Sequence, residues 1–149
     1  MLCYPSSIYD DCIANLQLNI SMVSKISEGV NIIVDSRYQP EHSNPEKNQF
    51  TFIYKITIEN NNDFAVRLLR RRWFIFDSNG VKREVEGEGV VGIQPMIEPS
   101  KSYHYISGCN LNTELGKMQG SYLLENLSNK KTFNVVIPAF VLEAPFKLN

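Results

Sequence analysis

The residues best suited to chemistry form the stretch Gly87–Gly92, with the sequence GEGVVG. Its spacing matches the G-x-G-x-x-G pattern of dinucleotide-binding proteins. In a Rossmann fold this pattern must open a helix, because the helix N-terminus meets the pyrophosphate. Pro95 and Pro99 follow closely, and proline is incompatible with a helix interior. The Rossmann interpretation is therefore rejected.

Two interpretations of these glycines remain open. Successive glycines can present a concave set of backbone N–H groups that binds an anion without a helix, although Glu86 and Glu88 would repel a phosphate. Alternatively, the glycines permit a bulge or a sharp crossover between strands. This second interpretation is favoured, because a glycine pattern without other motifs is weak evidence for a binding site. The residues of this candidate anion-binding or partner-binding site are Gly87, Glu88, Gly89, Gly92, Arg71 and Lys82.

Other polar side chains do not form a catalytic or metal-binding pattern. His42 and His104 are the only histidines, and neither shows a metal-ligand spacing to carboxylates. Ser107 and His104 would point to opposite faces of one strand, so they do not form a nucleophile–base pair. We predict a non-enzymatic protein with no catalytic residue, no cofactor and no metal site, and with at most weak binding of Mg²⁺ or Co²⁺.

Composition and charge exclude several classes of protein. The chain has 149 residues, 43% hydrophobic and 21% charged, which indicates one globular domain with a substantial core. The formal net charge of −1 gives no drive toward nucleic acid. A run of about 20 apolar residues is missing, so we expect no membrane insertion. Three cysteines without a close pair, and an N-terminus unlike a signal peptide, predict a cytoplasmic protein.

The elements that position the glycines read as strands. Phe50–Ile58 alternates most clearly, with its aromatic and aliphatic side chains on one face. Arg70–Arg72 leads into the aromatic run Trp73–Phe76, and Asn79-Gly80 is a strong hairpin signal. The other segments with strand character are Val30–Tyr38, Phe64–Leu69, Val81–Glu86, Ser102–Cys109, Met118–Leu124 and Phe133–Ile137.

About seven strands and no convincing helix predict an all-β, immunoglobulin-like or fibronectin type III-like antiparallel sandwich, with a closed barrel as the alternative. We expect Trp73 and Tyr54 near the middle of the core, and Pro138 at the end of the last strand. Residues 1–24 show no sustained period and are predicted to be a loosely ordered extension, in which Ile13–Ile20 forms at most a weak helix. The folded domain is predicted to span residues 25–149.

Several separated motifs resemble the ApaG family over roughly Lys25 to Asn149. The motifs are Arg37-Tyr38, Leu68-Leu69 before Trp73, Gly87–Gly92 followed by Gln94-Pro95, then Pro99, Tyr105, Ser107-Gly108, Gly116-x-Met118-x-Gly120-x-Tyr122 and Ile137-Pro138-x-Phe140-x-Leu142. The resemblance implies a fibronectin type III-like sandwich. One departure is Arg72, which stands where members often carry a histidine before the tryptophan.

For function, the resemblance implies an association with cobalt resistance and magnesium efflux, and a glycine loop proposed to bind pyrophosphate. Related domains act as interaction modules in larger eukaryotic proteins, and no established reaction comes with the family. We therefore expect a binding domain whose partner is a protein or a nucleotide-like or pyrophosphate-like anion. The alternatives are a Mg²⁺-dependent phosphohydrolase using Glu86 and Glu88, and a direct cobalt or magnesium sensor. A free sheet edge could also support a homodimer.

Overall fold

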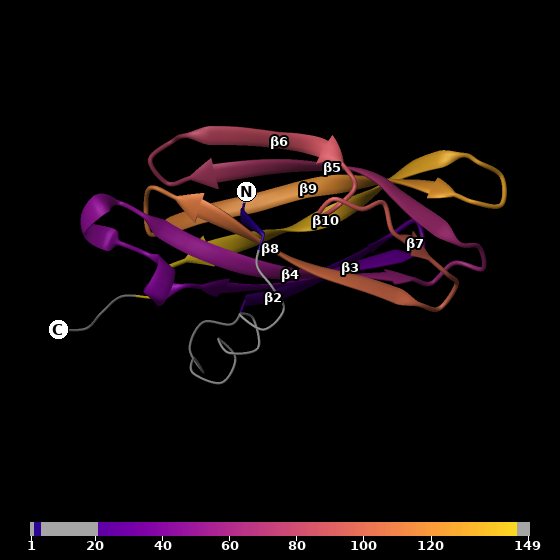
Figure 1. The fold of residues 1–149 in the computed structure, drawn as a ribbon, viewed down its shortest axis with the longest axis horizontal. Coiled ribbons are helices and arrows are strands. Elements are labelled where there is room, and N and C mark those ends of the chain that lie inside the picture. Colours follow the sequence, from indigo (N-terminus) through magenta and orange to yellow (C-terminus); the bar gives the residue numbers. More distant parts are fainter. Residues whose placement is uncertain (1, 4–20, 146–149) are drawn as a thin grey trace.

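The computed structural model describes residues 2–3 and 21–145, which form two antiparallel sheets packed face to face (Figure 1). The first sheet has the strand order β1-β8-β4-β3-β2, and the second has the order β10-β9-β5-β6, with β7 also paired to β5. The strands are β1 (Leu2–Cys3), β2 (Ser21–Ser27), β3 (Val30–Tyr38), β4 (Phe50–Asn60), β5 (Val66–Asp77), β6 (Lys82–Glu88), β7 (Met96–Ile97), β8 (Ser102–Leu111), β9 (Leu115–Asn126) and β10 (Thr132–Glu143). Two short 3-10 helices, Pro40–His42 and Pro45–Lys47, lie between β3 and β4.

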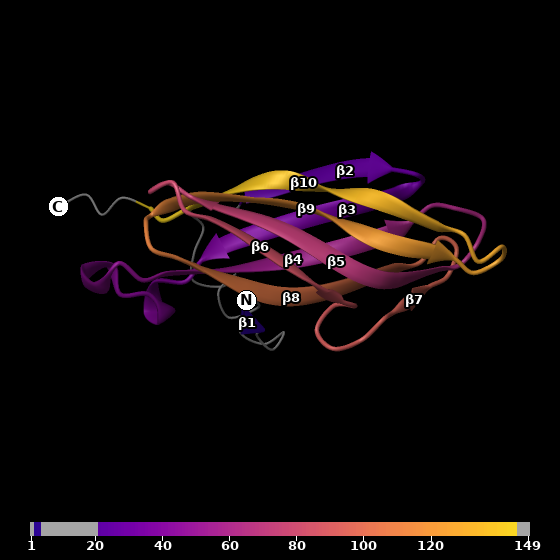
Figure 2. The ribbon, with the colours of Figure 1, turned by 90° about the horizontal axis from the view of Figure 1, so that it is seen from above.

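This arrangement confirms the predicted all-β sandwich. The closed-barrel alternative is wrong, because each sheet ends in edge strands that are not paired to the other sheet. Along one side, β10 lies beside β2 (Figure 2), and the amide of Val136 donates to the hydroxyl of Ser27 at 2.9 Å. No helix in the described ranges is long and apolar enough to cross a membrane.

The second strand, β2, has no counterpart among the predicted strands. It begins at Ser21, ahead of the predicted domain boundary at residue 25, and pairs with β3 along its whole length. The usual alternation is missing in this edge strand, because Met22 and Ile26 point outward, each 64% exposed, and Val23 is the one apolar residue among the inward positions. The predicted weak helix Ile13–Ile20 lies outside the described residues.

Large aromatic side chains fill the centre of the sandwich. Trp73 from β5 and Tyr54 from β4 are fully buried, as predicted, with ring centroids 5.4 Å apart. Phe140 from β10 completes the group, with its ring 5.8 Å from Tyr54 and 6.0 Å from Trp73. The sheets therefore meet through contacts between residues that are far apart in sequence.

The last strand corrects one prediction. Pro138 does not end it, because β10 continues to Glu143 and pairs with β9 on both sides of the proline. The register shifts between Ile137 and Phe140, so Pro138 and Ala139 form a bulge. Proline lacks a backbone donor and is tolerated at such a bulge on an edge strand.

The hairpin between β5 and β6 forms where Asn79-Gly80 predicted it. Of these two turn residues only Gly80 has a positive φ, +91°. The side chain of Asn79 accepts a hydrogen bond from the amide of Val81 at 3.0 Å. The amide of Asp77 also donates to the Val81 carbonyl at 2.9 Å. This turn fixes the register that places Glu88 opposite Arg70 and Gly87 opposite Arg71.

Candidate functional site: a glycine hairpin at the end of β6

The glycine stretch is a strand end followed by a tight hairpin. Gly87 and Glu88 are the last residues of β6, and Val90 and Ile93 then bridge each other through two backbone hydrogen bonds of 2.8 and 3.1 Å. Val91 and Gly92 between them have φ values of +48° and +78°, as a type I′ turn requires. A positive φ is rare for a β-branched residue such as Val91.

Gly89 closes this hairpin onto β5. It has a φ of +60°, and a Cβ atom at this position would lie 2.1 Å from the carbonyl oxygen of Ile93. Its amide donates to the carbonyl of Leu69 at 2.8 Å, and the side chain of Gln94 donates to the same oxygen at 3.0 Å. Leu69 is the extra residue of a bulge in β5, which explains why its carbonyl is available to the hairpin.

The amides of Gly89, Val90 and Ile93 are thus all donated to carbonyls within the protein. A nest for an anion needs backbone N–H groups that converge on open space. The glycines instead allow the backbone to reverse sharply after β6, which is the second of the two interpretations drawn from the sequence.

Arg71 supports the hairpin from the inner side of the sheet. It faces Tyr122 and Gly87 on the neighbouring strands, and its Nη1 donates to the carbonyls of Glu88 at 2.9 Å and Gly89 at 3.0 Å. A Cβ atom at Gly87 would lie 3.0 Å from the Arg71 guanidinium. Gly87 therefore leaves the space through which Arg71 reaches the hairpin.

Lys82 is not part of this group. It lies at the opposite end of β6, five residues from Gly87, which is about 16 Å in an extended strand. Its ammonium group stands 5.9 Å from the centre of the Phe76 ring. The structure therefore brings together Gly87, Glu88, Gly89, Gly92 and Arg71 from the predicted site and separates Lys82 from them.

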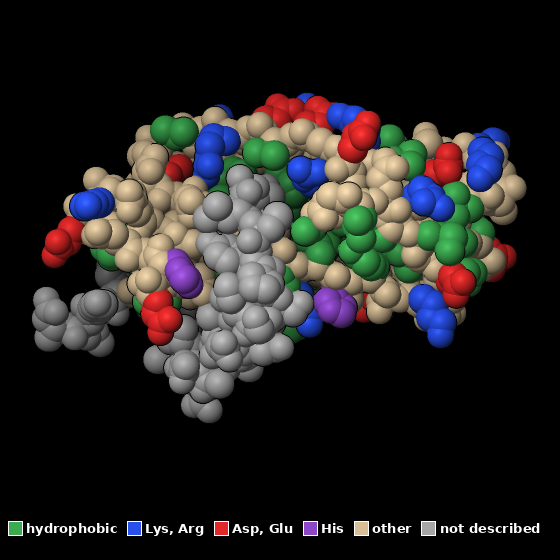
Figure 3. All heavy atoms as spheres, viewed as in Figure 1, with side chains coloured by type: hydrophobic (Ala, Val, Ile, Leu, Met, Phe, Trp, Pro, Cys, Tyr) green, Lys and Arg blue, Asp and Glu red, His purple; other side chains and the backbone are tan. Residues whose placement is uncertain are grey.

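The outer face of β5 and β6 carries a row of opposite charges, visible along the top of Figure 3 where Figure 1 places β6. Arg72 pairs with Glu84 at 2.7 Å, whereas Arg70 is shared between Glu86 at 3.6 Å and Glu88 at 4.0 Å. Two arginines thus face three glutamates, and the Glu88 side chain is 78% exposed. The least compensated carboxylates lie next to the hairpin.

Sequence reasoning missed the apolar side chains of the hairpin. Val91, Ile93 and Met96, named here the hairpin patch, are 47%, 50% and 50% exposed. Hydrophobic side chains gather around β7 in Figure 3. The available signal was four large apolar residues between Gly89 and Ile97, in a segment whose glycines and proline exclude a long regular strand.

A buried tyrosine pair lies behind Arg71 and joins the two sheets. The hydroxyls of Tyr105 on β8 and Tyr122 on β9 form a short hydrogen bond. Burial raises the pKa of both phenols well above the usual value near 10, and the nearby Arg71 charge opposes this only in part. Both tyrosines are therefore neutral anchors of the core.

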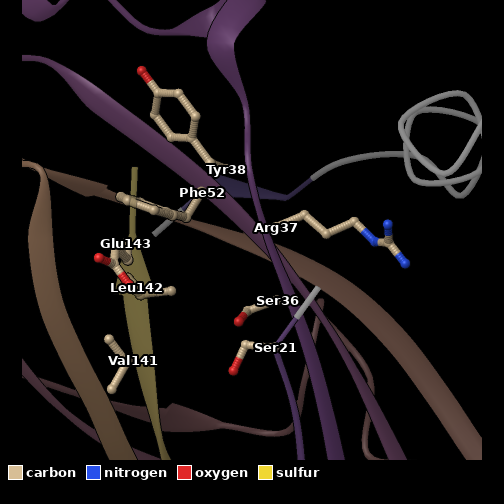
Figure 4. Close-up of a pocket in the computed structure, with 8 residues that line it drawn as sticks. All are labelled: Ser21, Ser36, Arg37, Tyr38, Phe52, Val141, Leu142 and Glu143. Atoms are coloured by element: carbon tan, nitrogen blue, oxygen red, sulfur yellow. The ribbon is translucent and has the colours of Figure 1, made fainter. Parts of the chain in front are cut away.

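A hollow of about 250 Å³ lies at the end of the sandwich opposite the hairpin (Figure 4). Its lining residues are Ser21, Ser36, Arg37, Tyr38, Phe52, Val141, Leu142 and Glu143. The Arg37 side chain points away from the other seven (Figure 4). Among the described residues, this lining holds two serine hydroxyls and one carboxylate, with no histidine beside the serines to act as a general base. In the described part of the chain, no three His, Cys, Asp or Glu side chains gather as metal ligands would.

These features define a fibronectin type III-like β-sandwich with a glycine hairpin at one corner. The family model described as the ApaG domain matches residues 40–126, and the chain belongs to the ApaG family. Protein ApaG of Agrobacterium fabrum is 44% identical over 124 residues, which are 83% of this chain and 95% of that protein. Protein ApaG of Pseudomonas aeruginosa PAO1 is 44% identical over 127 residues, 85% of this chain and all of that protein.

A solved structure agrees with this assignment. The crystal structure of the putative ApaA protein from Bordetella pertussis superimposes with a TM-score of 0.76 at 36% identity. The match covers 79% of this chain and 95% of that one. The resemblance that the sequence motifs indicated is therefore confirmed.

Proposed function

We propose that this ApaG-family chain is a non-enzymatic binding domain that engages a protein partner through the hairpin patch. The observation that carries the proposal is the exposure of Val91 and Ile93 on a hairpin whose backbone is already fixed by internal hydrogen bonds, together with that of Met96 on the adjoining β7. Apolar side chains held on a rigid turn lose little conformational entropy on binding, which favours their use in a protein interface. Met is also enriched in such interfaces.

The same geometry favours a protein over a nucleotide or pyrophosphate. Three hairpin amides donate internally, and Nη1 of Arg71 is engaged by the carbonyls of Glu88 and Gly89. Glu86 and Glu88 add negative charge beside the turn, and this charge opposes an approaching phosphate. Calorimetric titration with pyrophosphate, ATP and diadenosine tetraphosphate should give no binding heat. Heat that is lost in Arg71→Met would instead establish the anion function.

The phosphohydrolase alternative makes a separate prediction. It requires Glu86 and Glu88 to hold Mg²⁺, whereas both carboxylates face the guanidinium of Arg70. Incubation with a nucleotide panel and Mg²⁺ should release no inorganic phosphate above the buffer control. Release that disappears in Glu88→Gln would overturn the non-enzymatic assignment.

Partner binding is tested by charge substitution in the hairpin patch. Val91→Asp and Ile93→Asp should each abolish capture of the native partner from cell extract, measured by quantitative mass spectrometry. Val141→Asp is a matched control, because Val141 on β10 is 48% exposed against 47% for Val91. Identical protein sets captured by all three variants and the wild type would place the interface elsewhere.

The family's association with divalent cations enters as part of the same proposal. We propose that a cytoplasmic partner carries any effect on Co²⁺ or Mg²⁺, since the described residues hold no cluster of metal ligands. Equilibrium dialysis should detect no binding of either ion at physiological concentration. Cells carrying Val91→Asp should be as cobalt-sensitive as cells lacking the gene. Tight binding of either ion by the purified chain would support the direct sensor instead.

A further inference from the structure

β6 (Lys82–Glu88) is an exposed edge strand. It ends the order β10-β9-β5-β6, and no strand in the described part of the chain pairs with its outer side. Its seven residues span about 23 Å and present a row of backbone donors and acceptors on that side. Such an edge is a template for the addition of a strand from another polypeptide.

Side chains on the outer face give this edge a charge preference. Glu84, Glu86 and Glu88 alternate along it, and the single arginine Arg70 serves both Glu86 and Glu88 at 3.6 and 4.0 Å. A strand added to β6 would place its own side chains directly across from these carboxylates. Opposite charges at such cross-strand positions stabilise a pair, so lysine or arginine is favoured there.

The inner face of the same strand has a different preference. Val85 is half-buried opposite Trp73, and Gly87 has no side chain. Arg83 does not occupy this region, because its guanidinium extends to the carbonyl of Asn110 on β8. Apolar side chains of an added strand would therefore fit alongside Val85. Beside Gly87 they would pack against the Arg71 guanidinium, which fills the space over that glycine.

We infer that the β6 edge binds an extended segment of a protein partner as an added strand. The segment alternates basic residues, facing Glu86 and Glu88, with apolar residues, facing Val85 and Gly87. This inference rests on the proposed function and deepens it, because the hairpin that carries Val91 and Ile93 follows directly after Glu88, the last residue of β6.

A second copy of this chain fits the edge poorly. A symmetric antiparallel pair of β6 strands centred on Glu84, Val85 or Glu86 always sets at least one glutamate opposite a glutamate. Like charges directly opposite each other destabilise a strand pair. Charge complementarity therefore selects a basic partner over self-association.

The test uses a fluorescent eight-residue peptide of alternating arginine and valine, titrated into the full chain by anisotropy. Binding should weaken at least tenfold in the double variant Glu86→Lys/Glu88→Lys. It should be unchanged in the matched control Glu114→Lys/Glu143→Lys, which alters two exposed glutamates at the other end of the sheet. A glutamate–valine peptide should bind the first double variant and not the wild type.

Two further measurements separate strand addition from simple charge attraction. A peptide N-methylated at every valine keeps its charge but cannot complete a backbone ladder, so it should not bind. Equal binding of that peptide would overturn the inference. Amides of β6 should exchange more slowly with peptide bound; protection confined to the hairpin patch would likewise overturn it.

Failure of the peptide experiments is distinguishable from failure of the proposed function. If the peptides do not bind while Val91→Asp still loses the native partner, strand addition is wrong and the partner-binding proposal stands. If Val91→Asp retains the partner, the proposed function fails at its own test, whatever the peptides show.

Discussion

At the scale of single residues, Gly89 and Gly92 show two different reasons why a position requires glycine: a positive φ and the lack of space for a Cβ atom. Both have a positive φ, +60° and +78°, which side chains rarely adopt. At Gly89 a Cβ atom would also collide with the carbonyl oxygen of Ile93, whereas at Gly92 it would meet open space. The backbone conformation is similar at the two positions, but only Gly89 is closed in by its surroundings.

Gly89→Ala should therefore destabilise the protein more than Gly92→Ala. Backbone strain alone accounts for about 1 kcal/mol at either position, and the collision at Gly89 adds to it. Urea unfolding measures both differences in the free energy of unfolding. Equal losses in the two variants would show that the hairpin opens without consequence for the fold.

At the scale of elements, Arg71 ties the hairpin to β5. Two adjacent arginines offer a comparison, because Arg71 donates to two hairpin carbonyls while Arg72 is half-exposed and pairs with Glu84. Hydrogen bonds from a charged group contribute about 1.5–3 kcal/mol, whereas an exposed ion pair contributes at most about 1 kcal/mol. A methionine at position 71 would therefore remove two charged hydrogen bonds to the hairpin, whereas at position 72 it would remove only an exposed ion pair.

Arg71→Met should speed hydrogen exchange at the amides of Gly89 and Val90 by at least tenfold, because the hairpin loses its support. Arg72→Met should leave both amides unchanged. Exchange measured by NMR on the two variants decides this. Equal protection in wild type and Arg71→Met would mean that the Leu69 carbonyl alone holds the hairpin.

The sandwich as a whole depends on contacts between its two sheets. Trp73→Ala removes a fully buried ring that contacts Tyr54 and Phe140, and should lower the free energy of unfolding by about 3–5 kcal/mol. Phe74→Ala, on the outer face of the same strand, should lower it by less, because Phe74 is only half-buried. A Trp73→Ala protein that melts like the parent would contradict this placement.

The Tyr105–Tyr122 bond across the sheets predicts a pH dependence. Burial raises both phenol pKa values above those of the unfolded chain, so above pH about 10 the unfolded state releases protons that the folded state keeps. Stability is then fully present below pH about 9 and falls at higher pH, by up to about 1.4 kcal/mol per pH unit for each tyrosine. Tyr105→Phe/Tyr122→Phe should show a shallower fall in urea unfolding between pH 8 and 11. Parallel curves would contradict the assignment.

Much of this fold could be predicted because strand alternation is local. The period of two in Phe50–Ile58 placed its aromatic and aliphatic side chains on one buried face, although Thr51 and Ile53 on the other face are buried too. The same rule placed Arg71 opposite in direction to Arg70 and Arg72. The separation of Lys82 from Gly87 was also present in the sequence, since it follows from strand length alone. Edge strand β2 escaped prediction because its inward positions are mostly polar, with only Val23 packing against the core, while its apolar Met22 and Ile26 face outward.

The candidate site depends on contacts that local sequence patterns do not predict. The sequence by itself determined the antiparallel sandwich, its buried aromatic centre and the turn at Gly80, because each depends on the order of neighbouring residues. Only the tertiary structure decided that the Gly89 amide meets the Leu69 carbonyl and that Arg71 holds the hairpin. Those partners are about 20 residues apart, and the bulges at Leu69 and Pro138 arise from pairing between strands, which composition and periodicity do not record.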